Sequence, residues 1–314
     1  MTRYLARRLV LMALTLLLTS ILIFALTQLL PGDVARLILG REARPEALEN
    51  LRIQLGLNDP VPMQYWNWLT GFVSGDWGTS FIGGSAPIRP LVLERLGNSL
   101  KLALLALTFC VPLSILLGAV AALREQKFVD GAISLFTLAV VGLPEFVTGL
   151  ALINIFALGL GWFPASASAD TPTLGELLRQ LTLPALTASF VLIAYIVRLT
   201  RAGVVDELKK PYVRTATLKG LSRRAVLVRH VLRNALAPTI TVIAISFGWL
   251  IGGLVVIENV FSYPGLGRLM TAAVERKDIP LMQAVVMVVI FFYAAANLIA
   301  DLLVAFLNPR VRLE

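Results

Sequence analysis

Long, uninterrupted apolar runs along the chain predict helices that cross a membrane. Each run is about twenty residues long, which is the length that a helix needs to cross the hydrocarbon core of a bilayer. The strands of a transmembrane barrel would instead show about ten residues of alternating polarity. The predicted spans are Leu9–Leu30, Leu100–Leu123, Ala132–Leu158, Leu183–Arg198, Ala237–Ile257 and Gln283–Phe306. The expected fold is therefore an all-α polytopic membrane protein with six transmembrane helices.

Two of these spans need a further argument. The span that ends at Arg198 is short, but the chain must return across the membrane before the basic segment that follows. The first span resembles a secretory signal peptide, yet its apolar run is longer than a secretory core and no small-x-small cleavage site follows it. We therefore expect an uncleaved first helix.

Composition supports the same class of protein. The chain is 57% hydrophobic and only 15% charged, whereas a soluble domain is about 25% charged. In lipid the backbone must satisfy its own hydrogen bonds, which only helices and closed barrels achieve. The single cysteine, Cys110, lies in the second span, so no internal disulfide is possible.

The basic residues predict the orientation of the spans, because Lys and Arg next to a span favour the cytoplasmic side. With the amino terminus inside, the inner segments hold 17 of the 28 basic residues and five acidic ones. The outer segments then hold 11 basic and 12 acidic residues. The net charge of +9 is therefore a signal of topology rather than of nucleic-acid binding. Both termini are expected in the cytoplasm.

The spans divide the chain into an amino-terminal helix, an extracytoplasmic segment, a five-helix core and a cytoplasmic tail, at 1–30, 31–98, 99–308 and 309–314. The extracytoplasmic segment predicts short helices at Glu46–Leu55 and Met63–Val73 and a tight turn at Gly75–Ser80. It could form a lid on the bilayer surface or contact an external partner. Both interpretations stay open at this point.

The segment 199–236 is the most informative part of the sequence, because a simple connection between two spans needs few residues. Pro211 suits the first turn of a short helix, and Gly220 can end that helix in the left-handed conformation. Ser222 can then cap a second helix, which places Leu227 and Val231 on one apolar stripe. Such a pair of helices could dock on a soluble partner, or the second helix could rest on anionic lipid.

Several classes of enzyme are excluded by what the sequence lacks. It has one histidine and one cysteine, so a metal site built from clustered His and Cys is excluded. No Gly-x-x-x-x-Gly-Lys-Ser/Thr motif is present, so the chain does not bind nucleotide through a P-loop. Glu145 and Asp301 lie at different predicted depths, which argues against a catalytic carboxylate pair. No catalytic residue is therefore assigned.

An ionisable residue within a span is costly and indicates a function by default. Glu145 follows Pro144, which removes a backbone donor and loosens the helix. Glu145 is therefore expected either to line a pathway or to make a buried structural hydrogen bond. Asp301 is expected to face a basic side chain near the inner surface.

Several motifs in order give the chain a family resemblance. Thr215–Gly220, followed by Leu236-Ala237-Pro238, resembles the EAA loop of ABC importer permeases. The whole of residues 1–312 resembles the B-type permease of the dipeptide, oligopeptide and nickel group, through Leu30–Asp33, Leu55–Leu57, Gln64-Tyr65, Gly75–Ser80, Glu258–Gly267 and Asn297–Leu303. The chain departs from the family pattern at the first EAA position, although Glu207 lies upstream, and at Pro211, Asn308 and Glu145.

The resemblance implies a type I ABC importer permease fold in the bacterial inner membrane, with a cytoplasmic coupling helix that docks on an ATPase subunit. The partners implied are a second permease, two cytoplasmic ATPases that bind ATP and Mg²⁺, and an external substrate-binding protein; this chain itself would bind no cofactor. The implied cargo is a dipeptide or oligopeptide, with nickel, glutathione or an opine as alternatives. The candidate coupling residues are Tyr212, Val213, Arg214, Thr215, Ala216, Leu218, Lys219 and Gly220, and the candidate pathway residues are Pro144, Glu145 and Glu258.

Two other classes of protein fit the sequence less well. An intramembrane enzyme lacks paired catalytic groups in the spans. An ion-driven carrier would be expected to show inverted repeats that share charged groups, and the sequence shows neither.

Overall fold

A computed structural model describes residues 2–29, 35–36, 43–54, 56–80, 86–171 and 173–307 of the chain. Within these residues four continuous helices are long and apolar enough to cross a membrane. They are α1 (Thr2–Leu29), α5 (Ile88–Leu123), α8 (Leu174–Leu208) and α14 (Ile279–Leu307). The motif Pro31-Gly32-Asp33 and the predicted tail 309–314 lie outside the described residues.

Two further spans are bent. The first joins α6 (Phe128–Gly142) to α7 (Glu145–Leu152) and its π-helical extension η1 (Ile153–Gly159), with a bend of 106°. The second runs through the short helix α10 (Arg223–Val226) and η2 (Leu227–Val231) into α11 (Leu232–Gly253), and it bends by 51° within α11, between Leu236 and Pro238. If each bent pair is one span, the described residues contain six, the number predicted.

The third predicted span, Ala132–Leu158, is broken at Pro144, where the sequence predicted only that the helix is loosened. Leu143 is extended, with φ −92° and ψ 132°, because the ring of Pro144 disfavours the helical conformation in the residue before it. The helix restarts with Glu145 at its first position. Two other boundaries also differ, since α5 begins twelve residues before the predicted Leu100 and α8 begins at Leu174.

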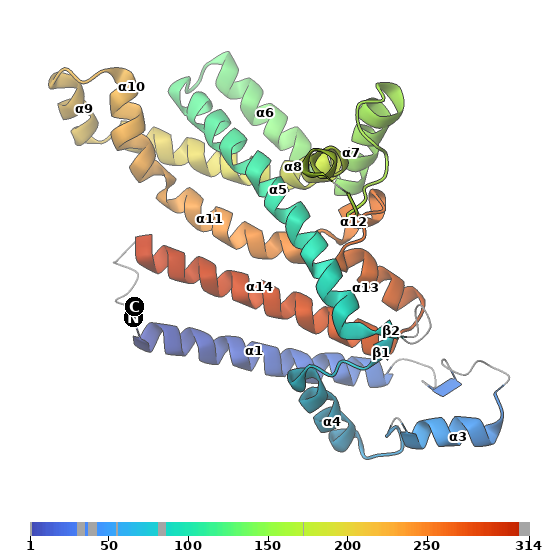
Figure 1. The fold of residues 1–314 in the computed structure, drawn as a ribbon. Helices are drawn as coiled ribbons and strands as arrows, with labels where there is room; N and C mark the ends of the chain where they lie inside the picture. Colours follow the sequence, from blue (N-terminus) through green and yellow to red (C-terminus); the bar gives the residue numbers. More distant parts are fainter. Residues whose placement is uncertain are drawn as a thin grey trace.

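The long helices pack in a sequence that differs from their order in the chain. Helix α1 lies against α14, α14 against α11, α11 against α8, and α8 against α5, and Figure 1 shows α1, α14 and α11 stacked side by side. Gly118 and Gly203 allow two of these contacts to be close. A Cβ atom on Gly118 would lie 2.8 Å from the carbonyl oxygen of Val197 in α8, and one on Gly203 would lie 2.6 Å from that of Ala235 in α11.

The start of α1, the end of α14 and the short helix α9 (Pro211–Leu218) all lie at one end of the molecule (Figure 1). The opposite end carries α12 (Val255–Val260), α13 (Leu266–Glu275) and the hairpin of β1 (Thr79–Ser80) with β2 (Ala86–Pro87). The described residues therefore separate the basic segment from the predicted outer segments, as the charge pattern requires.

The described part of the predicted extracytoplasmic segment folds beside α1. The predicted short helices are present as α3 (Pro45–Gln54) and α4 (Val61–Ser74). The ring of Phe24 in α1 lies 5.5 Å from Tyr65 and 5.7 Å from Trp68 of α4, and the hydroxyls of Ser20 and Tyr65 are 2.8 Å apart. These contacts attach α4 to the first span rather than leaving it free.

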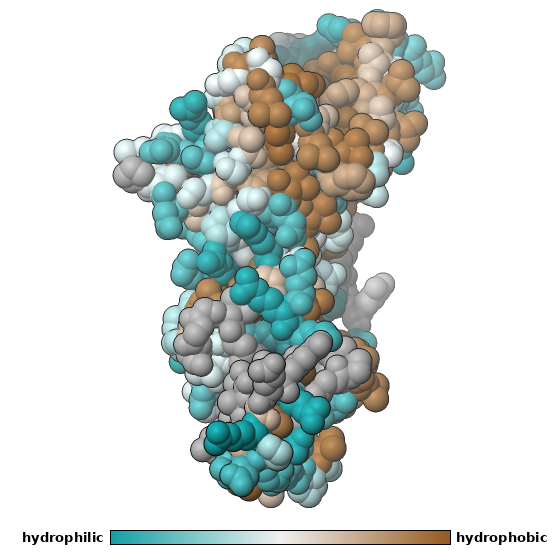
Figure 2. Space-filling model, turned by 90° about the vertical axis from the view of Figure 1, so that its right-hand side faces the viewer, coloured by the Kyte–Doolittle hydropathy of each residue, from teal (hydrophilic) through white to brown (hydrophobic). Residues whose placement is uncertain are grey.

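The surface fits a membrane protein. Figure 2 shows apolar residues gathered over the upper part of one face and polar residues over much of the lower part. Among the large apolar side chains that are exposed are Phe146, Leu150, Ile155 and Leu158, which belong to the bent third span. Exposure of this kind suits contact with lipid or with another apolar subunit.

Candidate functional site

The basic segment forms two short helices joined by a glycine turn, as the sequence predicted. Helix α9 begins at Pro211 and ends at Leu218. Gly220 then has a φ of +81°, which favours glycine because a Cβ atom is strained there. The Oγ atom of Ser222 accepts a hydrogen bond of 3.3 Å from the backbone N–H of Ala225 and so caps the following helix.

Helix α9 is tied to two spans through one carboxylate. Glu207, near the end of α8, accepts a hydrogen bond of 2.6 Å from the hydroxyl of Tyr212 and one from the ammonium group of Lys210. The side-chain amide of Asn234 in α11 donates to the same tyrosine hydroxyl at 3.4 Å. Burial, followed by the carboxylate of Glu207, raises the pKa of Tyr212. The network links α9 to both α8 and α11.

One side of α9 packs into an apolar cluster. Ala216 is 9% exposed and lies in a cluster with Val204 and Val205 of α8 and with Val226 and Val231 of the next helix. Val213 packs against the same cluster. Their small or branched side chains therefore hold α9 to its own chain.

The placement of the candidate coupling residues corrects part of the expectation. Ala216 and Val213 were expected to face a partner, but they face this chain's own helices because the apolar side of α9 has valines of α8 available to cover it. Tyr212 is partly buried in the carboxylate network. The residues that remain exposed are Arg214, Thr215, Leu218, Lys219 and Gly220. Leu218 is 80% exposed at the end of α9.

An ion pair between α8 and α6 was not identified from the sequence. Arg201 of α8 donates two hydrogen bonds to the carboxylate of Asp130 in α6, at 2.6 and 2.7 Å. The same carboxylate accepts from the backbone N–H of Gln126 at 3.0 Å. No local signal points to this pair, because its members lie 71 positions apart.

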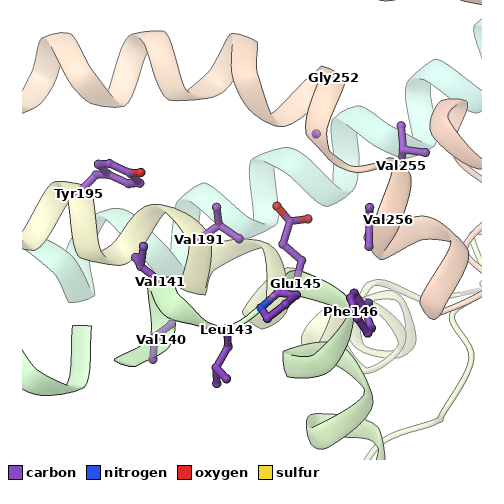
Figure 3. Close-up of a pocket in the computed structure, with 12 residues that line it drawn as sticks. Val140, Val141, Leu143, Glu145, Phe146, Val191, Tyr195, Gly252, Val255 and Val256 are labelled. Atoms are coloured by element: carbon purple, nitrogen blue, oxygen red, sulfur yellow. The ribbon is translucent and has the colours of Figure 1, made fainter. Parts of the chain in front are cut away.

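Glu145 lines a cavity of about 570 Å³ between α6, α7, α8, α11 and α12. Figure 3 shows its carboxylate directed into the cavity, between Val191 of α8 and Val256 of α12. The walls are otherwise apolar, apart from the hydroxyl of Tyr195. The bend at Pro144 is what turns the start of α7 toward this space.

A second cavity of about 520 Å³ shares Val141 and Tyr195 with the first. It continues along α8 past Arg198 to Ala202. The two cavities together form a groove, which we call the α8 groove, on one side of this helix. The groove runs from Glu145 toward the end of the molecule that carries α9.

Glu258 does not line this groove and lies fully buried near α13. Its Oε1 atom accepts a hydrogen bond of 2.5 Å from the hydroxyl of Ser99, and its Oε2 atom accepts one of 3.0 Å from the backbone N–H of Arg268. The Ser99 oxygen also accepts from the N–H of Leu266. The backbone N–H groups of Leu266 and Arg268, which have no acceptor within the first turn of α13, are paired in this way. Burial raises the pKa of Glu258 to about 7, while these hydrogen bonds act in the opposite direction.

The expectation that Glu258 lines a pathway is therefore corrected for the described residues. The side chain fills the space beside Gly265, where a Cβ atom would lie 2.1 Å from its carboxylate. The position follows from the turn between α12 and α13, which folds the carboxylate back over the start of α13. Among the described residues, no group of three or more His, Cys, Asp and Glu side chains could hold a metal ion.

The chain matches two family descriptions over most of its length. Residues 114–313 match the binding-protein-dependent transport system inner membrane component, and residues 1–93 match the amino-terminal part of the same kind of protein. A probable peptide ABC transporter permease of Sinorhizobium fredii is 37% identical over 310 residues, covering 98% of this chain and 99% of that protein. The glutathione transport system permease of Escherichia coli is 36% identical over 312 residues, covering 99% of each.

A putative peptide transport system permease of Brucella abortus is 40% identical over 303 residues and covers 95% of each chain. The fold is also similar to the solved MetNI methionine ABC transporter, with a TM-score of 0.56 at 13% identity over 71% of this chain and 99% of that one. This likeness shows the shared fold of type I importer permeases. The chain belongs to the family of binding-protein-dependent transport system inner membrane components, the permeases of ABC importers.

Proposed function

We propose that this chain is one of two permease subunits that line the path of an ATP-driven peptide importer in the bacterial inner membrane. The observation that carries the proposal is the α8 groove together with α9, which is held at the end of α8. Helix α8 contributes Val191, Tyr195 and Arg198 to the groove. Near its end it carries Glu207, which holds α9 through the hydroxyl of Tyr212. One rigid helix thus connects a cavity within the membrane to a basic surface outside it.

In this proposal α9 is the coupling helix and docks on a cytoplasmic ATPase subunit. Its exposed Leu218 would supply apolar contact, with Arg214 and Lys219 as charges at the rim of the interface. ATP and Mg²⁺ would be bound by the ATPase subunits and not by this chain. The side of the membrane that carries α9 and both termini would be cytoplasmic, as the basic residues indicate.

The coupling would be mechanical. A displacement of α9 by a closing pair of ATPases passes to α8 through Glu207 and the apolar cluster around Ala216, and to α11 through Asn234. Both of these helices line the α8 groove. The bundle would then exchange between two packed arrangements, one open to each side.

A peptide is the cargo best supported, because relatives that are 37% and 40% identical carry names of peptide permeases. A cavity of about 570 Å³ is within the usual range of roughly 300–1,000 Å³ for small-molecule sites. Glutathione is the second candidate, since a relative at 36% identity is named for its transport. An external binding protein would deliver the cargo in either case.

The docking role can be tested in proteoliposomes that hold this chain, the second permease and two ATPase subunits, with the binding protein added outside. Leu218→Asp should abolish retention of the ATPase subunits and ATP-dependent peptide uptake, because a charge would enter the apolar contact. Val73→Asp in α4 is the matched control, since Val73 is 78% exposed and Leu218 is 80% exposed. The control should retain the ATPases. Normal retention and uptake with Leu218→Asp would show that α9 is not the docking element.

A further inference from the structure

Glu145 is the one charged residue among the twelve that line the cavity at the outer part of the α8 groove. The remaining walls come from apolar side chains, two glycines, a proline and a tyrosine. A carboxylate in such surroundings attracts a cation more strongly than it would in water, because less solvent screens the two charges. The position of Glu145 therefore favours the binding of a positively charged ligand.

The carboxylate of Glu145 has no hydrogen-bond or ion-pair partner among the described residues of the chain. The structural alternative, a buried hydrogen bond that satisfies this group, is thus not met within that part of the chain. The side chain is half-buried and opens to the cavity rather than to another helix. An ionisable group of this kind within a span is costly unless it serves a function.

The space opposite the carboxylate is available to a ligand. Gly252 of α11 stands above Glu145 in Figure 3, and a Cβ atom placed on this glycine would meet nothing within 4 Å. Tyr195 of α8, which also lines the cavity, is 62% exposed. Val255 and Val256 complete an apolar surface beside the charge. A cationic group attached to an apolar chain would find both of its parts matched here.

We propose that Glu145 is a cation-selecting contact in the pathway, which receives the ammonium or guanidinium group of the cargo. This inference rests on the proposed function, because it takes the α8 groove to be part of the transport path. A free peptide carries such a group at its amino terminus, and basic peptides carry more. The carboxylate favours their passage over that of cargo with net negative charge.

The test uses the assembled importer and reads the local electrostatic field without depending on which cargo the binding protein accepts. Cys110→Ala removes the only native cysteine, and Val256→Cys places a reporter thiol in the wall of the cavity. The reporter is reacted with two methanethiosulfonate reagents, one with a trimethylammonium group and one with a sulfonate group. The ratio of the two reaction rates is measured with Glu145 and with Glu145→Gln.

Glu145→Gln should lower the ratio of the cationic to the anionic rate about tenfold, the effect expected of one nearby charge in partly screened surroundings. Glu145→Asp should keep most of the ratio. A second reporter, Ser74→Cys, lies in the exposed outer helix α4 and should show the same ratio in all three backgrounds.

Three outcomes would overturn the inference, and they separate it from the proposed function. A thiol at position 256 that reacts readily, with a ratio unchanged by Glu145→Gln, would refute cation selection and leave the pathway in place. A thiol that reacts with neither reagent in the working importer would refute the pathway role of the groove. Loss of the second permease from Glu145→Gln complexes would show that Glu145 forms an ion pair with that subunit instead.

Discussion

The hydroxyl of Tyr212 gives the sharpest test of how α9 is held. Tyr212→Phe removes the donor of the 2.6 Å hydrogen bond to Glu207 and the acceptor for Asn234, while the ring keeps its packing. A hydrogen bond to a charged group contributes about 1.5–3 kcal/mol. Because Tyr212 is only partly buried and Lys210 still neutralises Glu207, we expect a value around or below the lower end of this range, about 1–2 kcal/mol.

That loss acts locally, so the free energy of opening α9 should fall while the spans stay folded. A change of about 1–2 kcal/mol raises the population of the open state roughly 5- to 30-fold. Amide hydrogen exchange of a peptide that covers Pro211–Leu218 should accelerate by the same factor in the assembled complex. Uptake per ATP hydrolysed should fall as well, because a loosened α9 transmits less of its displacement to α8.

Tyr293→Phe is the matched control, since its hydroxyl has no hydrogen-bond partner among the described residues and the ring lies in α14. In the Tyr293→Phe variant, amide hydrogen exchange of α9 should equal that of the unmodified protein. If Tyr212→Phe left both the exchange of α9 and the uptake per ATP unchanged, the carboxylate network would not be what anchors this helix.

Two further changes test the packing and the buried carboxylate. Gly203→Ala should lower the melting temperature of the detergent-solubilised protein, because the added methyl group would lie 2.6 Å from the backbone oxygen of Ala235; the expected loss in free energy of unfolding is about 1–3 kcal/mol. Gly131→Ala is the control and should lower the melting temperature little, because nothing lies within 4 Å of a Cβ atom there. Equal melting temperatures of the two variants would contradict the close helix contact. Burial raises the pKa of Glu258 from 4.5 to about 7, so the folded state binds more protons than the unfolded state between these values and loses stability as pH rises through them. Glu258→Gln should flatten the fall in melting temperature between about pH 5 and pH 8, and an unchanged slope would show that another group titrates.

The sequence alone determined the features that depend on near neighbours. Apolar runs predicted the six spans, of which four are continuous helices and two are bent pairs. Pro211, Gly220 and Ser222 occupy the first turn, the left-handed turn and the cap that their residue types predicted. The carboxylate of Asp301 forms an ion pair of 2.8 Å with the guanidinium group of Arg8, in agreement with the prediction that it faces a basic side chain. Each of these follows from the intrinsic geometry of a residue or from its depth in the membrane.

The tertiary structure decided which side chains meet. The sequence suggested that Pro144 would loosen its helix, but the bend of 106° depends on how α7 packs against α8 and α12. The pairing of Asp130 with Arg201 and the contact of Glu258 with Ser99 join positions that are far apart in the chain. The burial of Ala216 depends on how α9 folds back onto the valines of α8 and of the helix that follows. Periodicity reports which face of a helix is apolar, but it does not report which neighbour covers that face. The packing of the helices therefore separated the carboxylate that lines the groove, Glu145, from the one that is buried away from it, Glu258.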